Sequence, residues 1–213
     1  MDNTKKALLS VFCIVLLWSG IAPHDYFTWF LEVLPALLAL LALAVTWNRF
    51  RFSNFIYVVV CIHAVILMIG GHYTYAEVPV GYWIKDLFDF ERNHFDRLGH
   101  FAQGFTPALI MREVAIKREI IRGRGWRFFF IASAVLGLSA FYEFFEWWTA
   151  LATGEAAAAF LGTQGDVWDT QWDMFMCTLG ALTALVLFRG LHDRYLNARP
   201  EIAGSNVTRG RTV

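Results

Sequence analysis

Long apolar runs alternate with short polar or basic connections along most of this chain. A helix needs about 20 mostly apolar residues to cross a hydrocarbon core about 30 Å thick. Six runs have roughly this length: residues 6–23, 28–47, 54–72, 95–111, 127–149 and 173–189. The pattern predicts an all-α fold, a polytopic membrane bundle of six transmembrane helices that forms one domain over residues 1–198. Residues 199–213 are rich in polar and turn-forming side chains and are expected to be a disordered cytoplasmic tail.

The first and fourth runs are the least typical of the six. Residues 19–23, at the end of the first run, lack the small-residue cleavage motif of a signal peptide, so we expect a retained first span. His100, Gln103 and Pro107 interrupt the fourth run. A helix with such residues is tolerated in a membrane when its polar face looks into the bundle rather than at lipid.

A shorter amphipathic segment is predicted between the third and fourth runs, within residues 79–91. Its apolar and charged positions fall on opposite faces of a helix: Trp83, Ile84, Leu87 and Phe88 against Lys85, Asp86 and Asp89. This spacing is typical of a short interfacial helix that lies on the membrane surface.

The basic residues predict the orientation of the bundle. With an internal N-terminus, 15 of the 18 lysines and arginines fall on the cytoplasmic side, and only Lys85, Arg92 and Arg97 fall outside. By the positive-inside rule both termini are then cytoplasmic. The expected location is a bacterial inner membrane, with membrane lipids as partners.

The composition is typical of a membrane protein and argues against nucleic-acid-binding and cysteine-stabilised proteins. The chain is 57% hydrophobic and 17% charged, whereas soluble domains carry about a quarter charged residues. Its net charge of zero supplies no basic excess for nucleic acid, so no nucleic-acid partner is expected. The three cysteines are far apart in apolar runs and predict neither a disulfide framework nor a zinc finger.

Three polar strings, at residues 94–103, 142–147 and 166–173, interrupt the apolar sequence. Asp96, Glu143 and Asp173 each lie 16 residues from an arginine that marks the inner boundary of their run. At 1.5 Å per residue, each is about 24 Å above that boundary. His72 and Glu32 reach nearly the same depth, and His100 lies deeper, at about 18 Å. We therefore expect one polar layer just beneath the outer interface.

These side chains suit two kinds of chemistry. One divalent metal ion would be bound by carboxylates and imidazoles, with His72, Asp96, His100, Glu143 and Asp173 as candidate ligands. Catalysis by acid and base would use Asp96, His100, Glu143, Glu146 and Asp173. The cost of ionisable groups in lipid favours a functional site. The structural alternative is a salt-bridge network in which Arg92 or Arg97 neutralises Glu143, Glu146 or Asp173 and locks the helices together.

The polar strings also carry a resemblance. Residues 71–75, 93–101, 142–147 and 166–173 resemble the YjdF-like bacterial inner-membrane proteins, over about residues 5–195. This resemblance implies a membrane topology and a shared polar signature, but no activity. More distantly, the order of these motifs is similar to that of VanZ-like membrane proteins. Glu146 and Cys177 depart from that pattern, which usually has glutamine and asparagine there.

The leading functional hypothesis is an outward-facing site that binds or acts on a lipid or cell-envelope headgroup. Asp96 and His100 would be ligands or acid/base groups, Glu143 and Glu146 ligands or bases, and Asp173 a ligand or orienting group. One alternative is a small proton-coupled transporter with His63 and His100 as its deeper relay. Another is a non-catalytic scaffold held by salt bridges. The sequence does not fix the ligand or the oligomeric state.

Overall fold

The computed structural model describes residues 2–154 and 158–197, and all regular structure among them is helical. This confirms the all-α prediction. The long helices are α1 (Asn3–Ser19), α2 (Tyr26–Thr46), α3 (Asn54–Tyr73), α5 (Phe95–Lys117), α6 (Arg124–Thr153) and α8 (Asp169–Val186). The shorter elements are η1 (Tyr75–Glu77), α4 (Pro79–Phe88), α7 (Ala158–Leu161) and α9 (Arg189–Asn197). The predicted tail, 199–213, lies outside the described residues.

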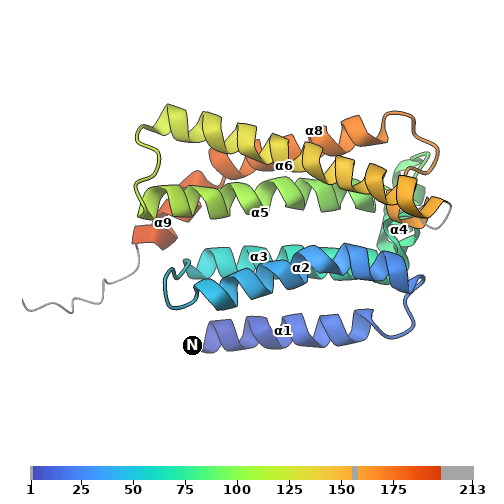
Figure 1. Cartoon of the computed structure of the whole chain (residues 1–213), viewed down its shortest axis with the longest axis horizontal. Coiled ribbons are helices and arrows are strands. Elements are labelled where there is room, and N and C mark those ends of the chain that lie inside the picture. Colours follow the sequence, from blue (N-terminus) through green and yellow to red (C-terminus); the bar gives the residue numbers. More distant parts are fainter. Residues whose placement is uncertain (1, 155–157, 198–213) are drawn as a thin grey trace, which may run out of the picture.

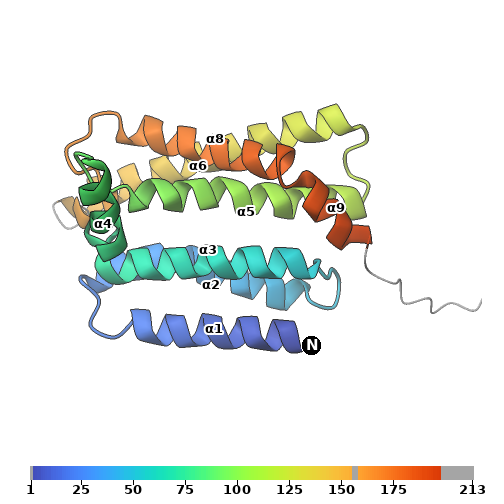
Figure 2. The ribbon, with the colours of Figure 1, turned by 180° about the vertical axis from the view of Figure 1, so that it is seen from behind.

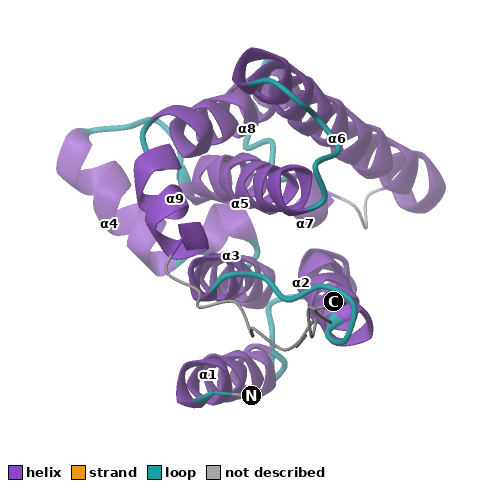
Figure 3. Ribbon diagram, turned by 90° about the vertical axis from the view of Figure 1, so that its left-hand side faces the viewer, coloured by secondary structure: helices purple, strands orange, loops and turns teal. Residues whose placement is uncertain are grey.

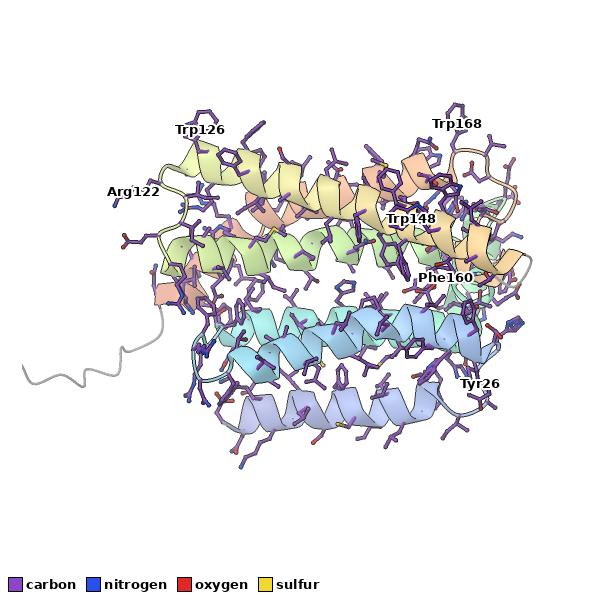
Figure 4. All side chains as sticks on the ribbon, viewed as in Figure 1. Tyr26, Arg122, Trp126, Trp148, Phe160 and Trp168 are labelled. Atoms are coloured by element: carbon purple, nitrogen blue, oxygen red, sulfur yellow. The ribbon has the colours of Figure 1, made fainter. Side chains whose placement is uncertain are left out.

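The long helices run side by side along one axis (Figures 1 and 2). Seen along that axis, they form two groups, α1–α2–α3 and α5–α6–α8, which α3 and α5 join (Figure 3). We call the end with residues 47–53, 118–123 and α9 the basic end. The end with residues 20–25, α4 and residues 162–168 is the aromatic end, where Tyr26 and Trp168 lie opposite Trp126 of the basic end (Figure 4). Helix α4, which falls within the predicted 79–91 segment, crosses the aromatic end.

Two helices end at other residues than the apolar runs predicted. Helix α5 continues to Lys117 instead of ending at residue 111, because Arg112 and Glu113 are buried and bonded to other elements. Helix α8 ends at Val186, and the chain then bends by 52° into α9.

Length and apolar composition mark fewer helices as membrane spans than the six predicted. Among the described residues, α2, α3 and α6 are long and apolar enough by themselves, and the bent pair of α8 and α9 makes a fourth if it counts as one span. Helix α1 has only 17 residues, and α5 carries the polar string that contains Asp96 and His100. Six spans are therefore not shown by these criteria alone.

Two glycines let α5 and α8 approach each other closely. A Cβ atom built at Gly104 would lie 1.7 Å from the carbonyl oxygen of Cys177, and one at Gly180 would lie 2.0 Å from that of Phe101. Small residues of this kind allow membrane helices to pack backbone to backbone. The contact lies next to the polar strings and fixes the distance between them.

The cysteines are free, as expected, with Cys61 and Cys177 buried and Cys13 exposed.

Candidate metal centre

Three helices bring four ionisable side chains together near the aromatic end. The imidazole of His100 on α5 lies between carboxylates from α5, α6 and α8. Its Nε2 atom is 3.6 Å from Asp96 and 3.8 Å from Asp173, and its Nδ1 atom is 3.9 Å from Glu143. We call these four residues the carboxylate–imidazole cluster. Each of their side chains is at most 13% exposed.

The start of α5 places two members of the cluster on one face. Asn93, two residues before the helix begins, accepts a hydrogen bond from the backbone N–H of Phe95 through its Oδ1 atom, an Asx turn that leads the chain into α5. Asp96 then falls in that turn, and His100 follows one turn later on the same side. Because Gly104 brings α8 against α5, Asp173 faces the same imidazole.

The distances within the cluster fit a shared cation better than direct pairing. All three contacts to His100 exceed the usual hydrogen-bond length of about 2.7–3.2 Å. Ligand atoms of Asp96, His100 and Asp173 all lie within 4.8 Å of one another. Two ligands of one ion are separated by at most twice the metal–ligand bond, about 4–5 Å for bonds of about 2.0–2.5 Å. The three side chains can therefore reach one ion, with Glu143 beside them.

Three buried atoms of the cluster have no hydrogen-bond partner: His100 Nδ1, Glu143 Oε1 and Asp173 Oδ1. Buried polar atoms are nearly always bonded, so three unbonded atoms at one location are available to bind an ion, a water molecule or a ligand. A carboxylate in an apolar interior needs either a proton or a cation nearby.

The arginines expected to neutralise this cluster have other partners. Arg92 pairs with Asp169, which starts α8, and its Nη1 is 3.3 Å from Asp166. Arg97 Nη2 is 3.0 Å from Asp166, and its guanidinium lies 4.7 Å from the centre of the Trp172 ring. The structure thus shows no ion pair of Arg92 or Arg97 with Glu143, Glu146 or Asp173 among the described residues, and the salt-bridge alternative gains no support at these three carboxylates. The connection before α8 folds over the aromatic end and supplies its own carboxylates.

The ionised form of the Asp166 carboxyl group is stabilised by its neighbours. A hydrogen bond from the backbone N–H of Trp168, together with the charges of Arg92 and Arg97, lowers the pKa of Asp166. Arg92 also donates a hydrogen bond to the carbonyl oxygen of Gly162. Together with the contacts of Arg92 and Arg97 to Asp166, this bond joins the start of α5 to the connection before α8 across the aromatic end.

Glu146 does not join the cluster but lines a cavity beside it. This cavity, about 240 Å³, lies between α2, α3, α5 and α6, and we call it the lateral cavity. Its lining near the aromatic end is polar and includes Glu32, Tyr75, Asp96, His100 and Glu146. Toward the basic end it is mainly apolar and includes Ala39, Val60, Leu138 and Ile110. Asp96 and His100 thus belong to both the cluster and the cavity wall.

His72 lies away from the other predicted ligands. Its Nδ1 atom is 3.0 Å from the carbonyl oxygen of Ser19, and its ring centre is 4.5 Å from that of Trp18. Although depth counting places His72 near the level of Asp96, the last turn of α3 directs its side chain toward the end of α1. The structure therefore does not bring His72 into the candidate metal site.

A family model described as a predicted membrane protein, DUF2238, matches residues 4–194 of the chain. The chain belongs to this DUF2238 family. It is also 44% identical over 202 residues to the inner membrane protein YjdF of Escherichia coli (strain K12), an alignment that covers 95% of both chains. These matches confirm the resemblance to YjdF-like proteins and the membrane class. No solved structure matches significantly.

The matched region of this DUF2238 chain contains the cluster, the lateral cavity and two groups, Glu32 and Tyr75, that were not among the predicted ligands or catalytic residues. Glu32 and Tyr75 are buried in the cavity wall, and the Tyr75 ring lies against Gly70 and Gly99, where a Cβ atom would come within 2.3 and 2.7 Å of it. The depth of Glu32 along its helix was the feature of the sequence that could have assigned it to the site. His63 also lines the cavity, with its Nε2 atom buried and unbonded.

No prediction from the sequence covered a second set of buried polar residues, which lies at the basic end. Glu113 is fully buried and accepts hydrogen bonds from the backbone N–H and hydroxyl of Ser53, both at 2.6 Å. His192 of α9 lies 3.0 Å from Glu113 and 3.1 Å from Arg112. Lys117 also pairs with Glu113. In contrast to the carboxylate–imidazole cluster, these groups satisfy one another, which is typical of a structural lock between α3, α5 and α9.

Proposed function

We propose that this chain is an inner-membrane protein with six spans, cytoplasmic termini and a single domain over residues 1–198. Helix α1 runs alongside α2 and α3, and its 17 residues rise about 26 Å, close to the thickness of the hydrocarbon core. The polar side chains of α5 face α6, α8 and the lateral cavity, which makes this helix acceptable as a span. Exposed Trp83 and Leu87 of α4 suit an interfacial position.

Labelling of single cysteines with an impermeant maleimide tests this topology in a cysteine-free background. Asp86→Cys on α4 is expected to react in intact spheroplasts, whereas Arg122→Cys in the basic connection is expected to react only after permeabilisation. Reaction of both residues in intact spheroplasts would contradict the proposed orientation.

We further propose that the carboxylate–imidazole cluster binds a divalent cation, and that the cation, with the polar end of the lateral cavity, binds a lipid or envelope headgroup. The observation that carries this proposal is the position of His100 within 3.6–3.9 Å of three carboxylates, none of which pairs with a lysine or arginine among the described residues. A mixed imidazole and carboxylate set suits Zn²⁺ or Mn²⁺.

The form of the lateral cavity supports an amphiphilic ligand. Its lining changes from Glu32, Asp96 and Glu146 at the aromatic end to Ala39 and Ile110 deeper in the bundle. Helix α2 packs on α3, and α6 packs on α5 and α8, while α2 and α6 share no extensive interface in the described part of the chain. Helix α7 contacts both α2 and α6, so a lipid would enter between these two helices beside α7, with its headgroup near the cluster.

Lipid retention by the purified protein tests this headgroup proposal. Lipids co-purified with wild type are measured by mass spectrometry and compared with those of Asp173→Asn and of Asp86→Asn, an exposed carboxylate variant. We expect Asp173→Asn to lose a specific lipid class at least fivefold, and chelation of wild type to have the same effect. Equal retention by all three proteins and after chelation would contradict a metal-dependent headgroup site.

A proton-coupled transporter is the second candidate, because His63 and His100 both line the cavity. Below His63 the lining is mainly apolar, with Val60, Pro107 and Ile110, which gives protons no evident path to the basic end. A His63→Leu variant separates the two functions. It is expected to abolish proton-coupled uptake if the transporter hypothesis holds, and to leave metal content unchanged if the site only binds headgroups. The salt-bridge scaffold has less support, because Arg92 and Arg97 pair outside the cluster.

A further inference from the structure

A second pocket lies at the opposite end of the bundle from the cluster. It has a volume of about 380 Å³ and lies where α6 begins and α5 and α8 end. Four arginines line it: Arg112, Arg124, Arg127 and Arg189. The rest of its lining is mostly apolar and includes Phe128, Leu185 and Val186. We call it the arginine pocket.

The charges in the arginine pocket are not balanced. Arg112 and Arg189 share a single carboxylate, that of Asp193. Arg124 and Arg127 pair with no carboxylate among residues 2–154 and 158–197. The pocket therefore carries a net positive charge beside an apolar surface. This combination suits a ligand with an anionic group attached to hydrocarbon.

The surroundings of the pocket place it at the level of lipid headgroups. Trp126 is 64% exposed, and Phe129 and Phe130 beside it are also exposed, as expected for side chains in contact with lipid. Trp126 and Arg122 lie at this end of the bundle, far from Trp168 (Figure 4). Helix α6 is one of the helices long and apolar enough to span a membrane, so its first turn lies near the interface.

We propose that the arginine pocket binds the phosphate of an anionic phospholipid. Guanidinium groups bind phosphate through paired N–H donors, and Arg124 and Arg127 are available to donate them. The acyl chains would then lie against Phe128, Leu185 and Val186. Basic pockets between helices at the cytoplasmic side are a recognised form of site for anionic lipids. This site is separate from the proposed headgroup site and does not depend on the cation.

Native mass spectrometry of the full chain, with phosphatidylglycerol or phosphatidylcholine added in detergent, tests the proposal. Wild type is expected to bind phosphatidylglycerol in preference to phosphatidylcholine. The double variant Arg124→Gln/Arg127→Gln is expected to lose that preference at least fivefold. Arg122→Gln, which removes an exposed arginine of the same connection that does not line the pocket, is the matched control and is expected to keep it.

Two results would overturn the proposal. One is an equal preference for phosphatidylglycerol in wild type, the double variant and the control. The other is displacement of the lipid by millimolar inorganic phosphate, which would assign the pocket to free anions. If the double variant does not fold, Arg124→Gln alone gives the same comparison, because Arg124 is exposed.

Discussion

The imidazole Nε2 atom of His100 lies 3.8 Å from the Asp173 carboxylate, although the two residues come from different helices. This approach depends on the glycine contact between α5 and α8, where Gly104 meets the backbone of Cys177. The polar cluster and the apolar packing below it are therefore one unit. Any change that separates the two helices should also change the cluster.

Gly104→Ala is expected to destabilise the protein by about 1–3 kcal/mol, because the added Cβ atom meets backbone that cannot rotate away. Thermal unfolding in detergent measures this loss. Gly137→Ala on α6 is the matched control, since nothing lies within 4 Å of its Cβ position. That variant should be neutral or more stable by about 0.5–1 kcal/mol. A similar effect of both substitutions would show that the close contact does not exist.

Asp166 should make stability depend on pH. The pKa of this carboxyl is lowered in the folded protein, so its contribution is complete above the unfolded pKa of about 3.9 and is lost as the pH falls through the folded value. The melting temperature of wild type should exceed that of Asp166→Asn near neutral pH, and the difference should shrink below about pH 4. A difference that stays constant from pH 3 to pH 7 would contradict the bonds to Trp168, Arg92 and Arg97.

Glu113→Leu should strongly destabilise the basic end. The substitution leaves the buried His192 and the Ser53 hydroxyl without their acceptor, and removal of one partner from a buried ionic group costs about 3–5 kcal/mol. Glu113→Gln keeps an acceptor oxygen and should lose less. Thermal unfolding of both variants checks this order, and two unaffected variants would show that α9 does not depend on Glu113.

Ala39→Trp should fill the deep part of the lateral cavity. We expect it to reduce co-purified lipid several-fold while the metal content stays at the wild-type level, because Ala39 lines the cavity on α2, a helix that contributes no member of the cluster. Lipid and metal are measured on the same preparation. Loss of metal together with lipid would indicate that the substitution disrupts the bundle rather than the cavity.

The sequence predicted how deep a residue lies along its helix better than it predicted which side of the helix that residue occupies. Asp96, Glu143 and Asp173 meet as expected, since the rise per residue is fixed and all three were counted from basic boundaries. His72 was counted in the same way, yet its side chain is directed toward α1. The rotation of a helix about its own axis is set by packing against its neighbours, and the apolar pattern of α3 does not specify it.

Partners distant in the sequence were the least predictable part of the site. Asp166 and Asp169 meet Arg92 only because the connection before α8 folds over the aromatic end. Glu113 follows an arginine at the edge of an apolar run, where charged residues are normally solvated. Its burial depends on Ser53 and His192, whose positions follow from the packing of α3 and α9 on α5.

The metal content of the purified protein tests the central claim most directly. After equilibration with Zn²⁺ or Mn²⁺ and removal of free metal, wild type should retain about one ion per chain, as three or four protein ligands would hold it. His100→Gln and Asp173→Asn should lose it, while Asp86→Asn and Glu146→Gln, which lie outside the cluster, should keep it. Folded wild-type protein that retains neither metal, or equal retention by all five proteins, would contradict the account.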